Sequence, residues 1–237
     1  MGKKMADLRF FEQAGRKIVV TGHYGSGKTE FSVSLVMLLI AEYPGKLALI
    51  DLDIVNPYFR SREKRDVLEK AGIAVYGSFY KTEVTAELPA IGADVRAPLE
   101  DTGCRVIIDA GGNDSGALIL NQFKKYFTDE ETTVLAVLNA NRPETGDVAG
   151  AIEHLTAIEK ATGLTITGII NNCHLLRETD PHTIIKGHRL CEEVSAATGK
   201  KIWCDCYPEG IVAPEDLTGL SGNLLPMGLY MRPTWMR

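Results

Sequence analysis

Short apolar runs alternate with helical patterns along most of the chain, from Lys17 to about Cys206. The runs have the lengths of strands that are buried on both faces, as in a parallel sheet covered by helices. They lie at residues 17–20, 47–50, 73–77, 105–108, 133–138, 166–170 and 201–204. This alternation predicts βαβ units, and therefore an α/β fold of three layers, with a mostly parallel central sheet and helices on both faces.

The segments between the apolar runs complete this picture. Helical patterns occupy residues 29–43, 61–71 and 183–198. Pro44 and Gly45 end the first of them, as expected for residues that cannot continue a helix. The stretch 77–103, which contains Pro and Gly, has no clear pattern, and the run 201–204 is the strand predicted last. Because no repeat or long linker interrupts the chain, we expect a single domain over residues 1–237, with a core at about 17–208 and a short C-terminal tail.

Composition narrows the class of protein. The chain has 237 residues, a net charge of −5, 45% hydrophobic and 24% charged residues, which is typical of a soluble globular domain. The longest mainly apolar stretch, residues 31–41, is too short to span a membrane, and the N-terminus lacks the apolar run of a secretory signal. We therefore expect a cytoplasmic protein with no membrane insertion. The acidic charge argues against binding to nucleic acid, and five cysteines, an odd number, favour reduced thiols.

A glycine-rich segment directly follows the first predicted strand. Residues 22–29, GHYGSGKT, match the phosphate-loop pattern G-x-x-x-x-G-K-[ST] between a strand and a helix. There, backbone N–H groups and the positive end of the helix can surround phosphate oxygens. We expect Lys28 to reach the terminal phosphates as a catalytic residue, and Thr29 to place its hydroxyl on Mg²⁺. The predicted nucleotide contacts of this segment are Gly22, His23, Tyr24, Gly25, Ser26, Gly27, Lys28, Thr29 and Glu30.

Acidic residues follow two later apolar runs. Asp51 and Asp53 come after residues 47–50, and Asp109 comes after residues 105–108. Because ligands of open parallel sheets bind beyond the carboxyl ends of the strands, these carboxylates are candidates to meet the phosphates. We predict that Asp109 and Asp51 support Mg²⁺ and that Asp53 positions or activates the attacking water, with Gly112 offering its N–H to the γ-phosphate. The alternative for each carboxylate is a helix cap.

The order of these motifs resembles that of a known family. The phosphate loop, Asp51-x-Asp53 and Asp109-x-x-Gly112 are similar to the MinD/ParA group of SIMIBI-class P-loop ATPases, which includes nitrogenase iron protein and CooC-like maturation factors. The resemblance covers residues 17–208. It implies a three-layer P-loop NTPase fold, a homodimer that encloses ATP between its subunits, and a change of protein partner on hydrolysis.

One position departs from that group. His23 stands where its members usually have an extra lysine, which reaches into the partner's nucleotide site. His23 either donates a hydrogen bond to phosphate or shapes the loop. In this respect the segment is similar to the metallochaperone GTPases related to HypB and UreG, whose loops also lack the extra lysine.

The residues after the run 166–170 bear on the choice of base. They are Asn171, Asn172, Cys173 and His174, without the aspartate of the guanine-binding N-K-x-D pattern. A side-chain amide offers a donor and an acceptor to the N6/N7 edge of adenine. We therefore expect ATP, with Asn172 as the nearer contact and Asn171 as a second contact or a strand-end turn residue. GTP is the alternative.

Besides a metallochaperone GTPase of the HypB and UreG kind, three functions are compatible with these features. The leading hypothesis is a Mg²⁺-dependent ATPase that acts as a switch on a client protein, in the assembly of a metal centre or of a complex. A second is a small-molecule ligase or kinase similar to dethiobiotin synthetase and its CobB/CobQ relatives, in which residues 77–103 would build the substrate pocket. A third is a nucleotide-binding regulator with negligible turnover.

The remaining cysteines and histidines carry weaker signals. Cys204 and Cys206 form a C-x-C pair, but two thiols are too few for a closed metal site unless a dimer supplies four. We interpret them as ordinary thiols at the end of a strand. His174, His182 and His188 lack the spacing of metal ligands on one helical face, and we expect them to face solvent.

Overall fold

The strands of the described chain form one eight-stranded sheet in which every pairing is parallel. The computed structural model describes residues 8–53, 64–77, 93–112, 119–127, 130–220 and 222–231. The strand order is β3-β2-β4-β1-β5-β6-β7-β8. The strands are β1 (Lys17–Thr21), β2 (Lys46–Asp51), β3 (Ala74–Gly77), β4 (Cys104–Asp109), β5 (Thr132–Leu138), β6 (Gly168–Asn171), β7 (Lys201–Pro208) and β8 (Leu224–Met227).

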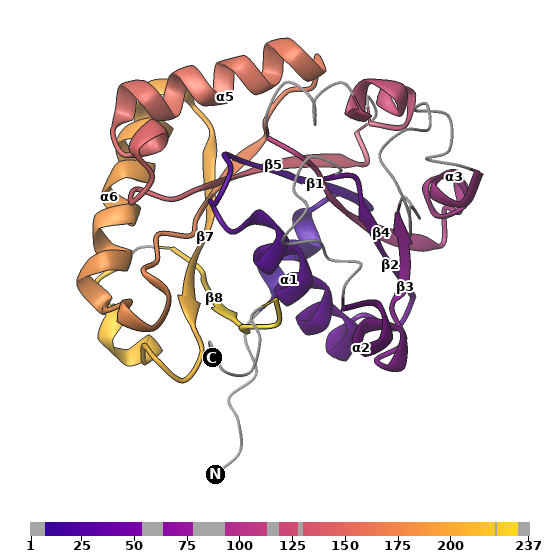
Figure 1. Cartoon of the computed structure of the whole chain (residues 1–237), viewed down its shortest axis with the longest axis horizontal. Helices are drawn as coiled ribbons and strands as arrows, with labels where there is room; N and C mark the ends of the chain where they lie inside the picture. The colour runs from indigo at the N-terminus through magenta and orange to yellow at the C-terminus, as the bar shows by residue number, and fades with distance from the viewer. Residues whose placement is uncertain are drawn as a thin grey trace, which may run out of the picture.

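Helices cover both faces of this sheet (Figure 1). One face packs against α1, α2 and the 3-10 helix η1, and the other against α3, α5 and α6. The helices are α1 (Lys28–Glu42), α2 (Arg65–Lys70), α3 (Ala93–Glu100), α5 (Val148–Thr162) and α6 (Pro181–Thr198), with short 3-10 helices η1 (Arg9–Gln13), η3 (Lys124–Tyr126), η4 (Pro143–Thr145), η5 (Leu176–Glu178) and η6 (Pro214–Leu217). The predicted three-layer α/β fold is confirmed.

Sequence signals mark both ends of the two long helices of the second face. The side chain of Asp147 accepts a hydrogen bond from the Gly150 amide at the start of α5, and Gly163 ends the helix with a φ of 62°. In the same way, Asp180 is the N-cap and Gly199 the C-cap of α6. An aspartate satisfies amides of the first turn, and a glycine adopts the left-handed conformation of the C-terminal cap at little cost.

The strand order brings the ends of three strands together. β4 lies between β1 and β2, and the parallel register aligns Asp109 with both Val20 and Asp51. All three residues lie at or next to the carboxyl ends of their strands, where the chain leaves β1 for the glycine loop. This is the edge at which open α/β sheets bind ligands.

Most predicted elements are present with small changes at their ends. The helix predicted at residues 61–71 corresponds to α2, although residues 61–63 lie outside the described chain. In the stretch 77–103, which had no clear pattern, the described part contains α3, while residues 78–92 lie outside. α3 buries Val95 and Leu99 against the sheet. A short helix that contains Pro98 has too weak a pattern to be recognised from sequence.

The C-terminal part of the prediction needs correction. The run 201–204 is not the last strand, because β7 continues to Pro208 and β8 pairs with it in parallel. The sheet therefore extends beyond residue 208 into what was expected to be a tail. β8 is only four residues long and contains a proline, so its sequence, LLPM, gives little sign of a strand. The last residues, 232–237, lie outside the described chain.

Among the described helices, none has the length and apolar character that crossing a bilayer would require.

The packing of η1 generates a prediction about stability. Phe11 is fully buried, with its ring centroid 5.5 Å from that of Trp203 on β7. Phe11→Ala is expected to lower the free energy of unfolding by about 3 to 5 kcal/mol, measured by urea denaturation, because it leaves a cavity below the sheet. Glu12→Ala, at an exposed position of the same turn, is the control. Equal stability of the two variants would show that η1 does not belong to the cooperative core.

Candidate functional site

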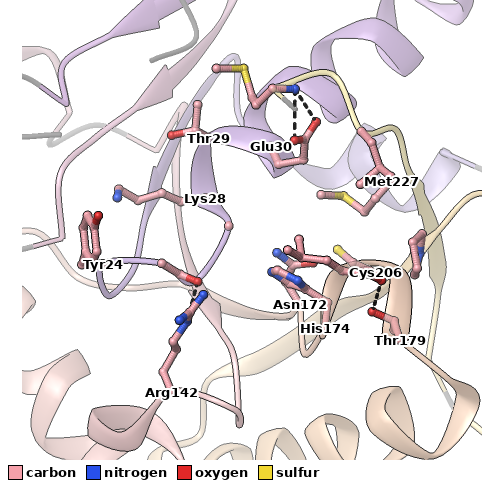
Figure 2. Close-up of a pocket in the computed structure, with 16 residues that line it drawn as sticks. Tyr24, Lys28, Thr29, Glu30, Arg142, Asn172, His174, Thr179, Cys206 and Met227 are labelled. Carbon is pink, nitrogen blue, oxygen red and sulfur yellow. Dashed lines mark hydrogen bonds between the residues drawn. The ribbon is translucent and has the colours of Figure 1, made fainter. Parts of the chain in front are cut away.

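A cavity of about 290 Å³ lies beside the glycine loop between β1 and α1. Its walls come from this loop and the start of α1, from the segment after β6, from the end of β7, and from the residues at and after the end of β8. Figure 2 shows two sides of the cavity. Tyr24, Lys28 and Thr29 lie on one side, and Asn172, Cys206 and Met227 lie on the other.

The loop has a backbone that only glycine adopts easily. The φ angles of Gly22, Gly25 and Gly27 are 151°, 75° and 87°. A Cβ on Gly27 would lie 2.3 Å from Nδ2 of Asn172, so both conformation and space exclude a side chain. Gly27 is also the N-cap of α1 and provides no capping side chain. The first amides of α1, at the positive end of the helix dipole, can therefore donate hydrogen bonds to an anion.

Lys28 and Asp53 form a buried ion pair at this edge. Lys28 Nζ lies 2.9 Å from Asp53 Oδ2, and the two side chains are 6% and 3% exposed. The backbone amide of Asp53 also donates to Asp51 Oδ1 at 3.1 Å, which ties the two carboxylates of the D-x-D segment together. The structure thus places the predicted catalytic pair, Lys28 and Asp53, in direct contact.

Asp109 lies at the end of β4, in the same buried cluster. Burial, and next the charge of Asp51, raise the pKa of Asp109 well above its usual value, while Lys28 opposes this effect. Both carboxylate oxygens are buried, and among the described residues neither has a hydrogen-bond partner of normal geometry, although the Thr29 hydroxyl is near enough to lower the pKa of Asp109. Buried carboxylates that lack hydrogen-bond partners favour the binding of a cation beside them.

These residues fit Mg²⁺ better than a metal enclosed by protein ligands alone. In the described parts of the chain, no group of three or more His, Cys, Asp or Glu side chains converges as a closed site would. Mg²⁺ usually keeps several waters and takes only one or two protein ligands beside substrate phosphates. Thr29, Asp51 and Asp109 could supply such ligands from three neighbouring elements.

Gly112 has a structural role that the sequence prediction did not include. A Cβ on Gly112 would lie 1.8 Å from the carbonyl oxygen of Gly22, so the chain after β4 packs directly on the start of the glycine loop. Only glycine permits this approach. Whether its N–H also meets a γ-phosphate stays a prediction.

His23 faces its own chain. Its Nδ1 donates to the carbonyl oxygen of Tyr24 at 2.9 Å, and its ring meets the edge of the His154 ring on α5, with centroids 5.1 Å apart. The Glu144 carboxylate lies 3.8 Å from the same nitrogen. Burial, and next the neighbouring His23, lower the pKa of His154 to about 4, so this ring stays neutral at pH 7. Of the two predicted roles, the contacts favour shaping of the loop.

The two asparagines after β6 have different surroundings. Asn172 lines the cavity, and its Nδ2 donates to the carbonyl oxygen of Ser26 at 2.9 Å. Asn171 is buried below it, where Nδ2 donates to Ile184 O and to Asp205 Oδ1 and Oδ1 accepts from the amide of Cys173. Both amide hydrogens of Asn171 are thus used within the protein. This placement corresponds to the alternative of a strand-end residue.

The expectation that all three histidines face solvent is wrong at His188. His188 is buried, and its Nδ1 lies 2.9 Å from Asp205 Oδ2, so an acid on β7 compensates for the burial of the ring. Burial raises the pKa of Asp205, against the effects of Asn171 and His188. His174 is half-buried and lines the cavity beside Gly27, where a Cβ on that glycine would lie 3.2 Å from His174 Nε2. Of the three histidines, His182 is the exposed one.

The C-x-C pair lies inside the protein. Cys204 and Cys206 are both buried free thiols, and Cys206 contributes to the cavity wall. Burial, and next the thiol of Cys204, raise the pKa of Cys206 well above its usual value. A neutral thiol is a poor metal ligand and a poor nucleophile. Cys206 therefore acts as a small apolar part of the cavity wall.

Sequence reasoning missed Arg142. This residue follows β5, and its Nε donates to the carbonyl oxygen of Gly25 at 2.8 Å, as Figure 2 shows. Its guanidinium lies so close to the loop that a Cβ on Gly25 would be 2.9 Å from Cζ. The rule that identified the acids after β2 and β4 applies equally to the end of β5 and could have identified Arg142.

Comparisons with known proteins support the fold. No protein-family model and no curated protein matches the chain. Among solved structures, the cell division protein FtsY of Thermotoga maritima is similar, with 20% identity and a TM-score of 0.54 over 79% of this chain and 60% of that chain. The signal recognition particle 54 kDa protein of Aeropyrum pernix, solved with GDP, has 19% identity and a TM-score of 0.53 over 83% of this chain and 43% of that chain.

This chain therefore spans less than two thirds of either protein. At this level of identity, the likeness shows the fold alone, which is that of P-loop nucleotide-binding proteins.

The contact of Arg142 with the loop generates a second prediction. Arg142→Ala is expected to weaken the binding of Mg²⁺–nucleotide about tenfold or more, because a charge-assisted hydrogen bond of about 1.5 to 3 kcal/mol that supports the loop is lost. Equilibrium titration with a fluorescent nucleotide measures the effect. Arg177→Ala, at an exposed position of η5, is the control. Unchanged affinity in Arg142→Ala would contradict a supporting role.

Proposed function

We propose that this protein binds Mg²⁺–ATP in the cavity beside residues 22–29, hydrolyses it, and acts as a nucleotide-dependent switch on a partner protein. One observation carries the proposal. The glycine loop, Lys28 and the buried carboxylates of Asp51, Asp53 and Asp109 meet at one edge of a parallel sheet. Phosphates would pair with the positive groups, which are Lys28 and the N-terminus of α1. A divalent cation would pair with the carboxylates.

The phosphates would lie at the N-terminus of α1, with Thr29, Asp51 and Asp109 as the side chains that hold Mg²⁺. The ion would neutralise charge on the phosphate oxygens. A terminal phosphate would compete with Asp53 for the ammonium of Lys28, since the two groups are now in contact at 2.9 Å. Asp53 would then be the carboxylate nearest to this phosphate and could position or activate the attacking water.

The orientation of Asn172 supports adenine as the base. The carbonyl oxygen of Ser26 can only accept, so it faces the NH₂ group of the Asn172 side chain, and Oδ1 is left as the acceptor. Oδ1 can accept a hydrogen bond from the amino group of adenine. It would be repelled by guanine, which carries another acceptor, an oxygen, at the same ring position. The GDP held by the signal recognition particle protein keeps guanine as the competing possibility.

The proposal includes a homodimer and a client protein, as the resemblance to the MinD/ParA group implies, and the cytoplasmic location that the composition favours. Because His23 contacts Tyr24 and His154 of its own chain, we propose that this dimer works without a basic residue from the partner's loop. The ligase alternative depends on residues 77–103, of which 78–92 lie outside the described chain. Turnover in the absence of a second substrate separates the two functions.

Hydrolysis is the first test. With Mg²⁺ and ATP alone, the protein is expected to release phosphate in a continuous coupled assay. Lys28→Ala should lose nucleotide binding, because the phosphates lose their buried cation, whereas Asp53→Asn should bind nucleotide and lose turnover. Lys46→Ala, whose exposed side chain lies at the start of β2, is the control. Phosphate release only after a metabolite is added would favour the ligase, and full turnover in Asp53→Asn would refute its role.

Base selectivity is the second test. The wild-type protein is expected to prefer ATP to GTP in competition titrations, and Asn172→Ala should reduce this preference about tenfold, the typical effect of one hydrogen bond in a pocket. Asn121→Ala, an exposed amide remote from the cavity, is the matched control. Equal affinity of the wild-type protein for ATP and GTP would contradict the assignment of Asn172.

A further inference from the structure

The segment after β8, residues 228–231, forms part of the cavity wall. Leu229 and Met231 line the cavity together with Met227 at the end of β8 and Cys206 at the end of β7. These side chains are apolar or sulphur-containing, unlike the loop and Lys28 at the phosphate side. Such a wall suits the flat apolar face of a purine and offers little to a phosphate. We refer to residues 228–231 as the strap.

Helix α1 holds the strap through two of its side chains. The Glu30 carboxylate accepts hydrogen bonds from the amides of Tyr230, at 2.5 Å, and of Met231, at 3.1 Å. One turn further along, Ser34 Oγ accepts from the amide of Gly228 at 3.1 Å. Glu30 and Ser34 are four residues apart and therefore lie on the same face of the helix. Hydrogen bonds from amides to a carboxylate are stronger than those between neutral groups.

The shape of the strap agrees with this attachment. A Cβ on Gly228 would lie 2.1 Å from the ring of Tyr230, so any larger residue in this turn would have to displace that ring. Figure 2 shows Glu30 directed to the strap, while Lys28 on the same helical turn points to the other side of the cavity. Glu30 lines the cavity and contacts the strap, and its direct contact with a nucleotide stays a prediction.

We propose that Glu30 is a positioning residue that holds the strap as the base-facing wall of the nucleotide site. This inference rests on the proposed nucleotide binding. Glu30 lies directly after Thr29. The first turn of α1 thus carries the residues proposed to bind the phosphates and also Glu30, which holds the strap on the base side of the cavity. Loss of the Glu30 carboxylate releases the strap amides and removes Leu229 and Met231 from the wall. The phosphate side keeps its loop, its lysine and its carboxylates.

The test compares two ligands of the wild-type protein and of Glu30→Ala. The ligands are Mg²⁺–ATP and Mg²⁺–tripolyphosphate, which has the phosphates but no base, and calorimetric titration measures both. Glu30→Ala is expected to weaken ATP binding about ten- to a hundredfold, as for the loss of charge-assisted hydrogen bonds, and to leave tripolyphosphate binding unchanged. Glu30→Gln, which keeps one acceptor oxygen, should give a smaller loss for ATP. Glu42→Ala, an exposed glutamate at the end of the same helix, should change neither.

Each remaining outcome has a defined meaning. Equal losses for both ligands would show that Glu30 supports the phosphate loop, and no loss for ATP would show that the strap does not form the base wall. Either result overturns the inference while nucleotide binding stands. A wild-type protein that binds neither ligand would refute the proposed function and the inference with it. If Glu30→Ala does not fold, Ser34→Ala, which removes only the contact with Gly228, provides the same comparison, with a smaller selective loss expected.

Discussion

The position of β4 between β1 and β2 is the constraint on which the candidate site depends. Parallel pairing aligns Asp109 with Asp51 on one side and with Val20 on the other, so the two carboxylates end at the level where the glycine loop begins. The chain after β4 then packs on the loop through Gly112 and Gly22, with no room for a side chain between them. The start of the glycine loop is therefore held in place against the segment that follows β4, the strand that carries Asp109.

This arrangement concentrates negative charge inside the protein. Burial, and next the charge of Asp51, raise the pKa of Asp109, and the ammonium of Lys28, already in contact with Asp53, opposes this shift only in part. Buried carboxylate charge is unfavourable without a compensating positive charge, so a bound cation would stabilise this cluster. Arg142 and Asn172 each donate to a carbonyl oxygen of the loop and fix its shape from two sides.

Helix α1 connects the two halves of the site. Its N-terminus faces the place where phosphates would bind, its first turn provides Lys28 and Thr29, and Glu30 holds the strap that forms the opposite wall. This wall comes from the end of β7, the end of β8 and the strap, all in the C-terminal part of the described chain. The glycine loop and the C-terminal strap, remote from each other in sequence, thus both contact α1 and both line the cavity.

The sequence by itself determined the parallel α/β class, the glycine loop and the acids after β2 and β4, because apolar periodicity and local motifs are properties of short segments. It did not determine β8, the burial of His188 against Asp205, the place of Arg142 or the attachment of Glu30. Each of these depends on a partner between 17 and 201 positions away along the chain, and no pattern within a segment encodes such a partner. Only the tertiary structure decided them, because the packing of the sheet brings these residues within hydrogen-bonding distance.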